Sequence, residues 1–234
     1  MTWRPVHRRY SRGMPIPTVV EAVVFDCDGL LLDTETCWSR AEAALFAEYG
    51  HEFGPPEKDL LIGRTLGAAC ANMAEYFGLP GQGPALQREL MPLVEAELGA
   101  DVQPMPGAVA LLELLAGRVP LGIATNSTRS QLTAALQASG LGAYFDISVT
   151  ADDVTNPKPD PDLYLRAFEL LSASANRVVA LEDSVTGATA ARASGAFLIT
   201  VPSQVGKCVE ADHLVPRLDD PSLTRWASAV VGVR

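Results

Sequence analysis

Short apolar runs rich in β-branched residues recur along the chain, and stretches with helical spacing separate most of them. The runs occupy residues 21–26, 119–125, 145–150, 177–182 and 196–201. The helical stretches occupy residues 107–117, 129–139 and 160–171. Buried strands that alternate with helices are typical of a parallel sheet covered on both faces. The sequence therefore predicts an α/β fold built on a Rossmann-like parallel sheet.

Residues 36–104 interrupt this alternation. They contain no convincing strand, and their apolar side chains form three stripes at helical spacing. Pro92 lies within the third stripe, where we expect the helix to kink or break. We therefore predict a helical cap subdomain at 36–104, inserted into an α/β core made of residues 19–35 and 105–234.

Composition and charge narrow the class of protein. The 234 residues are 48% hydrophobic and 20% charged, which is enough apolar material for a sizeable core. No apolar run approaches the ~18 residues of a membrane-spanning helix, so we expect no membrane association. The net charge of −10 argues against a general nucleic-acid binder.

Residues 1–18 contain four arginines and no acidic residue. They lack the apolar stretch of a secretory signal, and their prolines disfavour the amphipathic helix of an organellar signal. We expect a flexible basic tail there. The four cysteines form no C-x-x-C pair, which favours reduced thiols in a cytoplasmic protein.

Polar residues cluster where the predicted strands end, which is where open α/β sheets bind ligands. They are Asp26, Asp28, Thr125, Asn126, Ser127, Glu182 and Asp183, with Lys158 in a nearby loop. Taken singly, each could belong to a turn or a helix cap. Gathered at one edge, the carboxylates would repel one another without a cation, and hard oxygen ligands suit Mg²⁺. The lysine and hydroxyls suit a phosphoryl group, so the positions predict a magnesium-dependent phosphate site.

The order of these residues resembles the haloacid dehalogenase-like (HAD) hydrolases, specifically their phosphatase branch. The four matching motifs are Asp26-x-Asp28-Gly29, Thr125, Lys158 in N-P-K-P-D-P, and Glu182-Asp183. One D-x-D-G sequence would be weak evidence, whereas four motifs in order are strong evidence. The resemblance extends over residues 19–220. It implies a helical cap like that of the subgroup containing β-phosphoglucomutase and phosphoglycolate phosphatase.

The resemblance also implies a role for each motif residue. Asp26 would attack phosphorus and become an aspartyl phosphate. Asp28 would protonate the leaving oxygen and then deprotonate the attacking water. Thr125, with the amides of Asn126 and Ser127, would hold phosphate oxygens, while Lys158 would neutralise their charge and orient Asp26.

By the same resemblance, Mg²⁺ would be held by the carboxylates of Asp26 and Asp183 and by the backbone carbonyl of Asp28. Glu182 would be a direct or water-mediated ligand, or would pair with a base instead. Arg64 lies in a cap loop that resembles one whose arginine contacts a distal anionic group of sugar phosphates. A surface salt bridge is an equally open role for Arg64.

These features predict a Mg²⁺-dependent phosphatase of a small phosphorylated metabolite, such as a sugar phosphate. The alternative is a sugar phosphomutase resembling β-phosphoglucomutase. Those mutases carry a histidine ten residues after the second motif aspartate, and Trp38 stands there in this chain. A phosphometabolite-binding protein without turnover would be expected to have lost a motif residue, and all of them are present.

Overall fold

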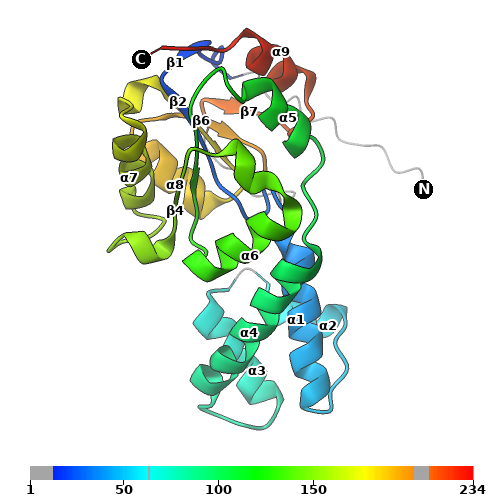
Figure 1. Ribbon diagram of the computed structural model, residues 1–234. Helices are drawn as coiled ribbons and strands as arrows, with labels where there is room; N and C mark the ends of the chain where they lie inside the picture. The colour runs from blue at the N-terminus through cyan, green and yellow to red at the C-terminus, as the bar shows by residue number, and fades with distance from the viewer. Residues whose placement is uncertain (1–12, 63, 203–210, 234) are drawn as a thin grey trace, which may run out of the picture. The chain divides into compact units, whose positions relative to one another are not determined.

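The computed structural model describes residues 13–62, 64–202 and 211–233. The predicted tail therefore lies mostly outside the described residues. By its internal contacts the chain divides into two units (Figure 1). We call Met1–Leu31, Pro104–Thr128 and Ala143–Arg234 the α/β unit, and Leu32–Gln103 with Arg129–Gly142 the helical unit.

A six-stranded sheet forms the centre of the α/β unit. Its strands are β2 (Ala22–Phe25), β3 (Leu121–Ala124), β4 (Ile147–Val149), β5 (Val178–Glu182), β6 (Phe197–Thr200) and β7 (His213–Leu214). The order is β4-β3-β2-β5-β6-β7, and every pair is parallel. All five predicted strands are confirmed. Three two-residue strands were not predicted: β7, and β1 (Val19–Val20) with β8 (Val231–Gly232), which form a small sheet of their own. Two residues are too few to show the alternation of apolar and polar side chains that indicates a strand.

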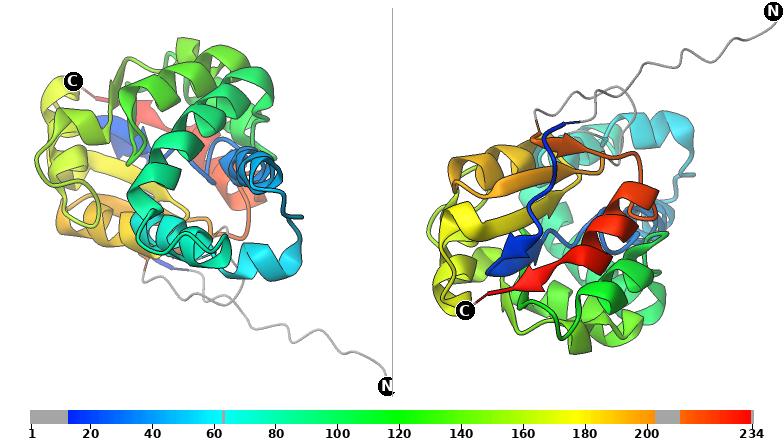
Figure 2. Two further views of the ribbon diagram at one scale, coloured as in Figure 1. Left: turned by 90° about the horizontal axis from the view of Figure 1, so that it is seen from below. Right: turned by 90° about the horizontal axis from the view of Figure 1, so that it is seen from above.

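Helices cover both faces of this sheet. The helices of the unit are α5 (Ala108–Leu115), α7 (Asp162–Leu171), α8 (Val185–Ala193) and α9 (Pro221–Ala229). Ala22 and Val24 of β2 share one apolar cluster with residues of α7 and α8. Val23 and Phe25 point to the opposite face, because side chains alternate along a strand, and both are fully buried. Figure 2 shows α5 and α9 on that side of the sheet. The α/β class and the Rossmann-like sheet are therefore as predicted.

The helical unit contains α1 (Thr34–Glu48), α2 (Pro55–Asp59), α3 (Leu66–Tyr76), α4 (Gly83–Asp101) and α6 (Arg129–Ser139). Helix α4 packs against α1, α3 and α6. The predicted division placed 129–139 in the core, whereas these contacts group α6 with the other helices of this unit. Helical spacing indicates that a helix has an apolar face but does not say which neighbour covers that face. Three short 3₁₀ helices, Leu141–Tyr144, Ala151–Asp153 and Ala175–Arg177, complete the described elements.

Helix α4 runs without interruption through Pro92, so the expected break is absent. An internal proline costs about 3 kcal/mol in an isolated helix. Leu90 and Val94 on either side are buried, and packing of this face offsets the cost.

At the start of α1, the Asp33 side chain caps the helix by accepting hydrogen bonds from the Thr36 backbone N–H and hydroxyl.

The sequence also led us to expect reduced thiols and no membrane-spanning helix. Cys27, Cys37 and Cys70 are buried free thiols, and Cys208 lies outside the described residues. No described helix combines the length and the apolar character needed to cross a membrane.

Candidate active site

The acidic residues of the site follow two neighbouring strands at the centre of the sheet. The chain runs outward from β2 through β3 to β4, then returns to β5 on the other side of β2. This reversal of strand order leaves a crevice at the strand ends, the usual ligand position in open α/β sheets. Phe25 pairs with Leu181, so Asp26 directly after β2 lies beside Glu182, the last residue of β5.

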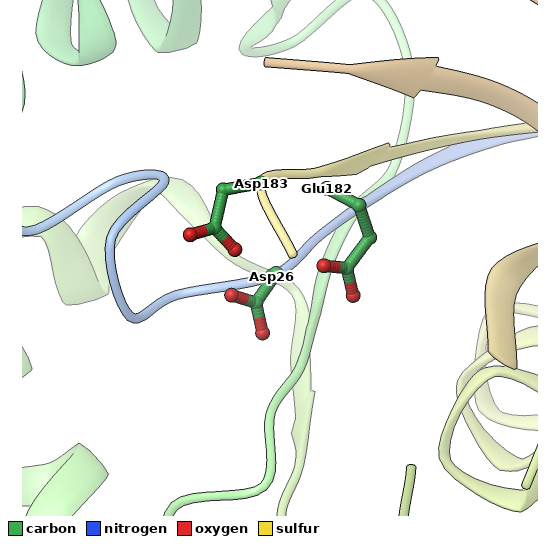
Figure 3. Close-up of side chains that lie close together, drawn as sticks. All are labelled: Asp26, Glu182 and Asp183. Atoms are coloured by element: carbon green, nitrogen blue, oxygen red, sulfur yellow. The ribbon is translucent and has the colours of Figure 1, made fainter. Parts of the chain in front are cut away.

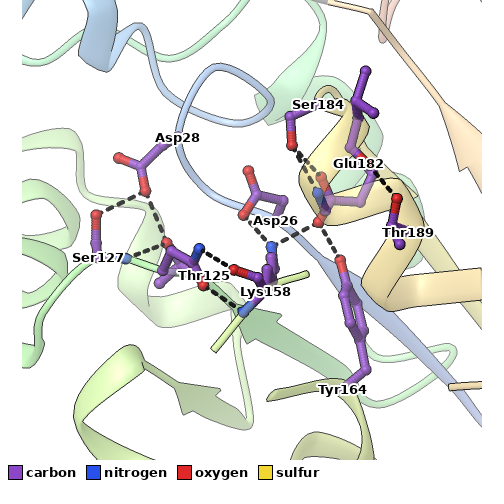
Figure 4. Close-up of polar contacts among 12 residues, drawn as sticks. Asp26, Asp28, Thr125, Ser127, Lys158, Tyr164, Glu182, Ser184 and Thr189 are labelled. Carbon is purple, nitrogen blue, oxygen red and sulfur yellow. Dashed lines mark hydrogen bonds and ion pairs between the residues drawn. The ribbon is translucent and has the colours of Figure 1, made fainter. Parts of the chain in front are cut away.

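A buried lysine joins these two carboxylates. Lys158 Nζ lies 2.6 Å from Asp26 Oδ1 and 2.6 Å from Glu182 Oε1 (Figure 4). The Lys158 side chain is 4% exposed, and those of Asp26 and Glu182 are 9% and 0% exposed. A buried charge is tolerated when it is paired and hydrogen-bonded, and the Lys158 ammonium has two such partners.

Glu182 has further partners beyond Lys158. The buried Tyr164 hydroxyl donates to Glu182 Oε1 at 2.5 Å, and the Ser184 hydroxyl lies 3.4 Å from Oε2. The Tyr164 ring lies 5.2 Å from Lys158 Nζ, within the range of a cation–π contact. Gly187 of α8 makes room for this carboxylate, because a Cβ there would lie 2.0 Å from Glu182 Oε2.

Asp28 is held by hydroxyl groups from the loop after β3. The Thr125 and Ser127 hydroxyls each donate to Asp28 Oδ2 at 2.8 Å. The Ser127 backbone N–H donates to the Thr125 hydroxyl oxygen at 3.0 Å. The Thr125 hydroxyl and the Ser127 hydroxyl thus contact Asp28. The phosphate role predicted for Thr125 and for the amides of Asn126 and Ser127 stays a prediction.

Asn126 fixes the backbone of Lys158. Its Nδ2 donates to the Lys158 carbonyl at 3.1 Å, and its Oδ1 accepts from the Lys158 N–H at 2.9 Å. This side chain therefore ties the loop after β3 to the loop that carries Lys158. These two bonds fix the backbone of the residue whose Nζ contacts Asp26 and Glu182.

The site holds more negative than positive charge. Burial raises the pKa of Asp26; Lys158 lowers this pKa, and Glu182, Asp183 and Asp28 raise it further. Burial lowers the pKa of Lys158, but Asp26 and Glu182 more than offset this and hold it above its usual value. Lys158 is therefore charged at neutral pH, and it does not by itself balance the carboxylates around it.

The carboxylates of Asp26, Glu182 and Asp183 form a buried acidic group. One oxygen of each lies within 4.8 Å of the others, and they converge from the ends of β2 and β5 (Figure 3). These hard oxygen donors and their excess negative charge fit a divalent cation. Asp28 was predicted as a ligand through its backbone carbonyl, which this grouping of side chains does not test.

The residues predicted in the cap lie in the helical unit. Arg64 is exposed, and its Nε donates to the Leu60 carbonyl at 2.8 Å. Trp38 on α1 is half-buried, and both residues line one cavity of this unit together with Lys58. The distal-anion role predicted for Arg64 stays a prediction.

The sequence reasoning missed Tyr164 and Gly187. Tyr164 was part of the predicted helix at 160–171, where it resembles any apolar residue of the buried face. Its hydroxyl partner, Glu182, is 18 residues away in the chain. No local pattern signals such a contact, because the packing of α7 against the sheet brings the two residues together.

The fold and the site together define an α/β protein with a buried acid–lysine cluster at the reversal of its strand order. A model of the haloacid dehalogenase-like hydrolases matches residues 23–201. The chain belongs to this family, as its motifs predicted.

Relatives and solved structures agree with this membership. A bifunctional riboflavin kinase/FMN phosphatase of Arabidopsis thaliana is 29% identical over 221 residues, 92% of this chain and 58% of that protein. The chain thus spans little more than half of that relative. A phosphorylated carbohydrates phosphatase of Thermotoga maritima is 32% identical over 189 residues, 75% of this chain and 82% of that protein.

The crystal structure of CbbY from Rhodobacter sphaeroides in complex with phosphate is 27% identical, with a TM-score of 0.70. The match covers 85% of this chain and 95% of that one. The family match and the phosphatase relatives together support the class of phosphoric monoester hydrolases for this chain. The mutase alternative is not favoured by these matches.

Proposed function

We propose that the chain is a Mg²⁺-dependent phosphatase that hydrolyses a small phosphorylated metabolite, such as a sugar phosphate, through an aspartyl phosphate on Asp26. The observation that carries the proposal is the placement of Lys158 between Asp26 and Glu182, two carboxylates that form one acidic group with Asp183. This arrangement combines a buried carboxylate nucleophile with a fixed cation and an acidic group suited to a metal. The phosphatase names of two relatives support the same class of reaction.

In the first step, a carboxylate oxygen of Asp26 attacks phosphorus and the bond from phosphorus to the ester oxygen breaks. Asp28 gives its proton to the departing oxygen, so the alcohol leaves neutral. The Thr125 and Ser127 hydroxyls hold Asp28 in place, since both contact the same Oδ2 atom. Lys158 holds Asp26 in one orientation and neutralises charge on the phosphoryl group.

In the second step, water attacks the phosphorus of the aspartyl phosphate. Asp28 takes a proton from this water, and the bond to Asp26 breaks to release inorganic phosphate. Both residues return to their starting protonation states. A Mg²⁺ ion held by Asp26, Asp183 and the Asp28 carbonyl would neutralise phosphate charge during both steps. Glu182 acts chiefly on Lys158 in this proposal, because its oxygens already accept from Lys158 and Tyr164.

The test measures phosphate release from a panel of phosphorylated sugars, sugar acids and nucleotides, with Mg²⁺ and with EDTA. We expect metal-dependent release from the wild type and none from Asp26→Asn. The control Asp59→Asn removes an exposed carboxylate at the end of α2 and should behave as the wild type. Acid-quenched enzyme should carry substrate-derived phosphate that hydroxylamine removes, and Asp26→Asn should carry none.

Release that persists in EDTA or in Asp26→Asn would overturn the mechanism. Binding of the panel without any release would favour the phosphometabolite-binding alternative. An isomerised sugar phosphate as product would instead support the alternative of a sugar phosphomutase.

A further inference from the structure

A buried threonine hydroxyl lies at the end of β6, one strand away from the acidic residues. Thr200 is the last residue of β6 and is fully buried. Within the part of the chain that the structure describes, its hydroxyl is the one buried side-chain polar atom without a hydrogen-bond partner. Buried polar groups are nearly always hydrogen-bonded in folded proteins, so this hydroxyl requires an explanation.

The hydroxyl of Thr200 does not improve the packing of its strand. The neighbouring residues Leu198, Ile199 and Val201 are buried and apolar. Valine has nearly the same shape as threonine and would bury no hydroxyl at this position. Because a buried hydroxyl costs free energy unless it is hydrogen-bonded, packing alone does not explain a threonine here.

Thr200 is the direct neighbour of Glu182 across the sheet. The two residues are paired in the parallel ladder of β5 and β6, and side chains paired in this way leave the sheet on the same face. Leu198, two residues before Thr200, belongs to the apolar cluster that contains residues of α7 and α8. Glu182 contacts Tyr164 of α7 on that face. The hydroxyl and the carboxylate are therefore neighbours on one side of the sheet.

Backbone hydrogen bonds hold Thr200 in this register. Its carbonyl accepts from the Val215 N–H at 3.0 Å, and the next residue, Val201, donates its N–H to the Glu182 carbonyl at 2.7 Å. A shift of the strand toward another acceptor would break both bonds. The hydroxyl therefore stays beside Glu182.

The two carboxylate oxygens of Glu182 are unequally hydrogen-bonded. Oε1 accepts from Lys158 at 2.6 Å and from Tyr164 at 2.5 Å (Figure 4). Among the described residues, Oε2 has only the Ser184 hydroxyl, at 3.4 Å. A carboxylate oxygen accepts about two hydrogen bonds, and a buried one is costly to leave without them. Thr200 thus has an unused donor where Glu182 has an unused acceptor.

A donor to Oε2 has a consequence for Lys158. Rotation of the Glu182 carboxylate about its Cγ–Cδ bond would move Oε1 away from Lys158 Nζ. A hydrogen bond to Oε2 opposes this rotation, because it fixes the second oxygen. Lys158 Nζ also contacts Asp26 Oδ1, so the orientation of Glu182 affects the proposed nucleophile through the lysine.

We propose that Thr200 is a positioning residue, whose hydroxyl donates through one bridging water to Glu182 Oε2 and so fixes the carboxylate that orients Lys158. A bridging water joins polar groups that lie too far apart for a direct hydrogen bond, and it is nearly as favourable in enthalpy as a direct one. The kinetic consequence of this contact rests on the proposed phosphatase function, whereas the contact itself does not.

The first test needs no turnover. The chain contains three lysines, so labelling lysine with ¹³C at Cε gives few NMR signals, and Lys158→Met identifies that of Lys158. With Mg²⁺ present, we expect Thr200→Val to displace or split the Lys158 signal and to lower the urea midpoint. Thr200→Ser keeps the hydroxyl and should retain the wild-type signal.

The matched control for this test is Ser194→Ala. It removes another buried hydroxyl of the same unit, which donates to the Ala191 carbonyl at the end of α8. This variant should leave the Lys158 signal in place even where its urea midpoint falls. The comparison separates an effect on Glu182 from a general loss of stability.

The second test measures kcat and KM for p-nitrophenyl phosphate at saturating Mg²⁺. We expect Thr200→Val to lower kcat at least about fivefold with little change in KM, because the orientation of Lys158 matters most in the transition state. Thr200→Ser and Ser194→Ala should both stay close to the wild type in kcat and KM.

The outcomes separate this inference from the proposed function. A wild-type Lys158 signal in Thr200→Val, with an unchanged or higher urea midpoint, would overturn the inference whatever the activity. Equal losses in Thr200→Ser and Thr200→Val, or a displaced signal with unchanged kcat, would also overturn it. A displaced signal in a protein that releases phosphate from neither p-nitrophenyl phosphate nor the earlier panel would reject the proposed function and retain the contact.

Discussion

Lys158 Nζ lies 2.6 Å from Asp26 Oδ1, although 132 residues separate the two in the chain. The same nitrogen contacts Glu182, so one ammonium group holds two buried carboxylates. Parallel strands deliver Asp26 and Glu182 side by side, and the loop tied down by Asn126 brings the lysine to them. The site thus depends on contacts among four separate segments.

Replacing Lys158 with Met should lower kcat by about 10²–10³-fold or more, the usual cost of removing a group that stabilises a transition state. It should also destabilise the fold by about 3–5 kcal/mol, because two buried carboxylates lose their cation. Phosphate-release assays and urea unfolding measure the two effects. The control Arg166→Met removes an exposed cation of α7 and should change neither. Activity within threefold of the wild type in Lys158→Met would contradict this view of the site.

Gly187→Ala should impair both stability and activity. The new Cβ would lie 2.0 Å from a Glu182 oxygen that is held by its neighbours, so the carboxylate must shift. Overpacking of this kind costs about 1–3 kcal/mol. The matched control is Gly67→Ala in α3, where a Cβ meets nothing within 4 Å and helix propensity favours alanine. Thermal unfolding and kcat check both variants, and equal behaviour of the two would refute the steric argument.

Tyr164→Phe tests whether the hydroxyl positions Glu182. The change removes a donor at 2.5 Å from a fully buried carboxylate and keeps the ring beside Lys158. A hydrogen bond to a charged group contributes about 1.5–3 kcal/mol, so stability should fall by about that amount. We expect kcat to fall more than KM changes, because Glu182 acts through Lys158. Tyr76→Phe, which removes a hydroxyl contact to Glu57 at an exposed position, serves as the control.

Mg²⁺ should raise the temperature of unfolding. The acidic group of Asp26, Glu182 and Asp183 carries more charge than Lys158 balances, and a cation relieves the repulsion in the folded state. At 100 times its Kd, a ligand stabilises the folded state by about 2.7 kcal/mol. Scanning calorimetry with Mg²⁺ and with EDTA measures this, and Asp183→Asn should lose most of the shift. An Asp183→Asn variant with the full Mg²⁺ shift would rule this residue out as a ligand.

Glu21→Gln should destabilise the protein at pH 7 but not in acid. The Ser174 backbone N–H donates to Glu21 Oε2 at 2.7 Å, and this hydrogen bond lowers the pKa of Glu21. A lowered pKa in the folded state means that the ionised carboxylate stabilises the fold above the unfolded pKa of about 4.3. This contribution disappears as the pH falls through the folded pKa. Urea midpoints of wild type and variant should therefore differ at pH 7 and converge once the pH has fallen below the folded pKa of Glu21. A gap that stays constant with pH would argue for lost packing instead.

Much of the α/β unit could be predicted because its signals are local. Each buried strand is a short apolar run, and the acidic residues follow Phe25 and Leu181 in register. Pro92 shows where local reasoning fails, since packing of α4 overrides the cost of the proline. The helix that packs against α6 could not be predicted either, because an apolar stripe does not identify the element that covers it.

The sequence by itself determined the sheet, its acidic strand ends and the four ordered motifs, because apolar periodicity and short spacings act within a few residues. Only the tertiary structure decided what those side chains contact. It assigned Asp28 to the hydroxyls of Thr125 and Ser127, and it joined Glu182 to Lys158 and Tyr164. Such partners depend on strand order and helix packing, which bring together residues that no local pattern connects.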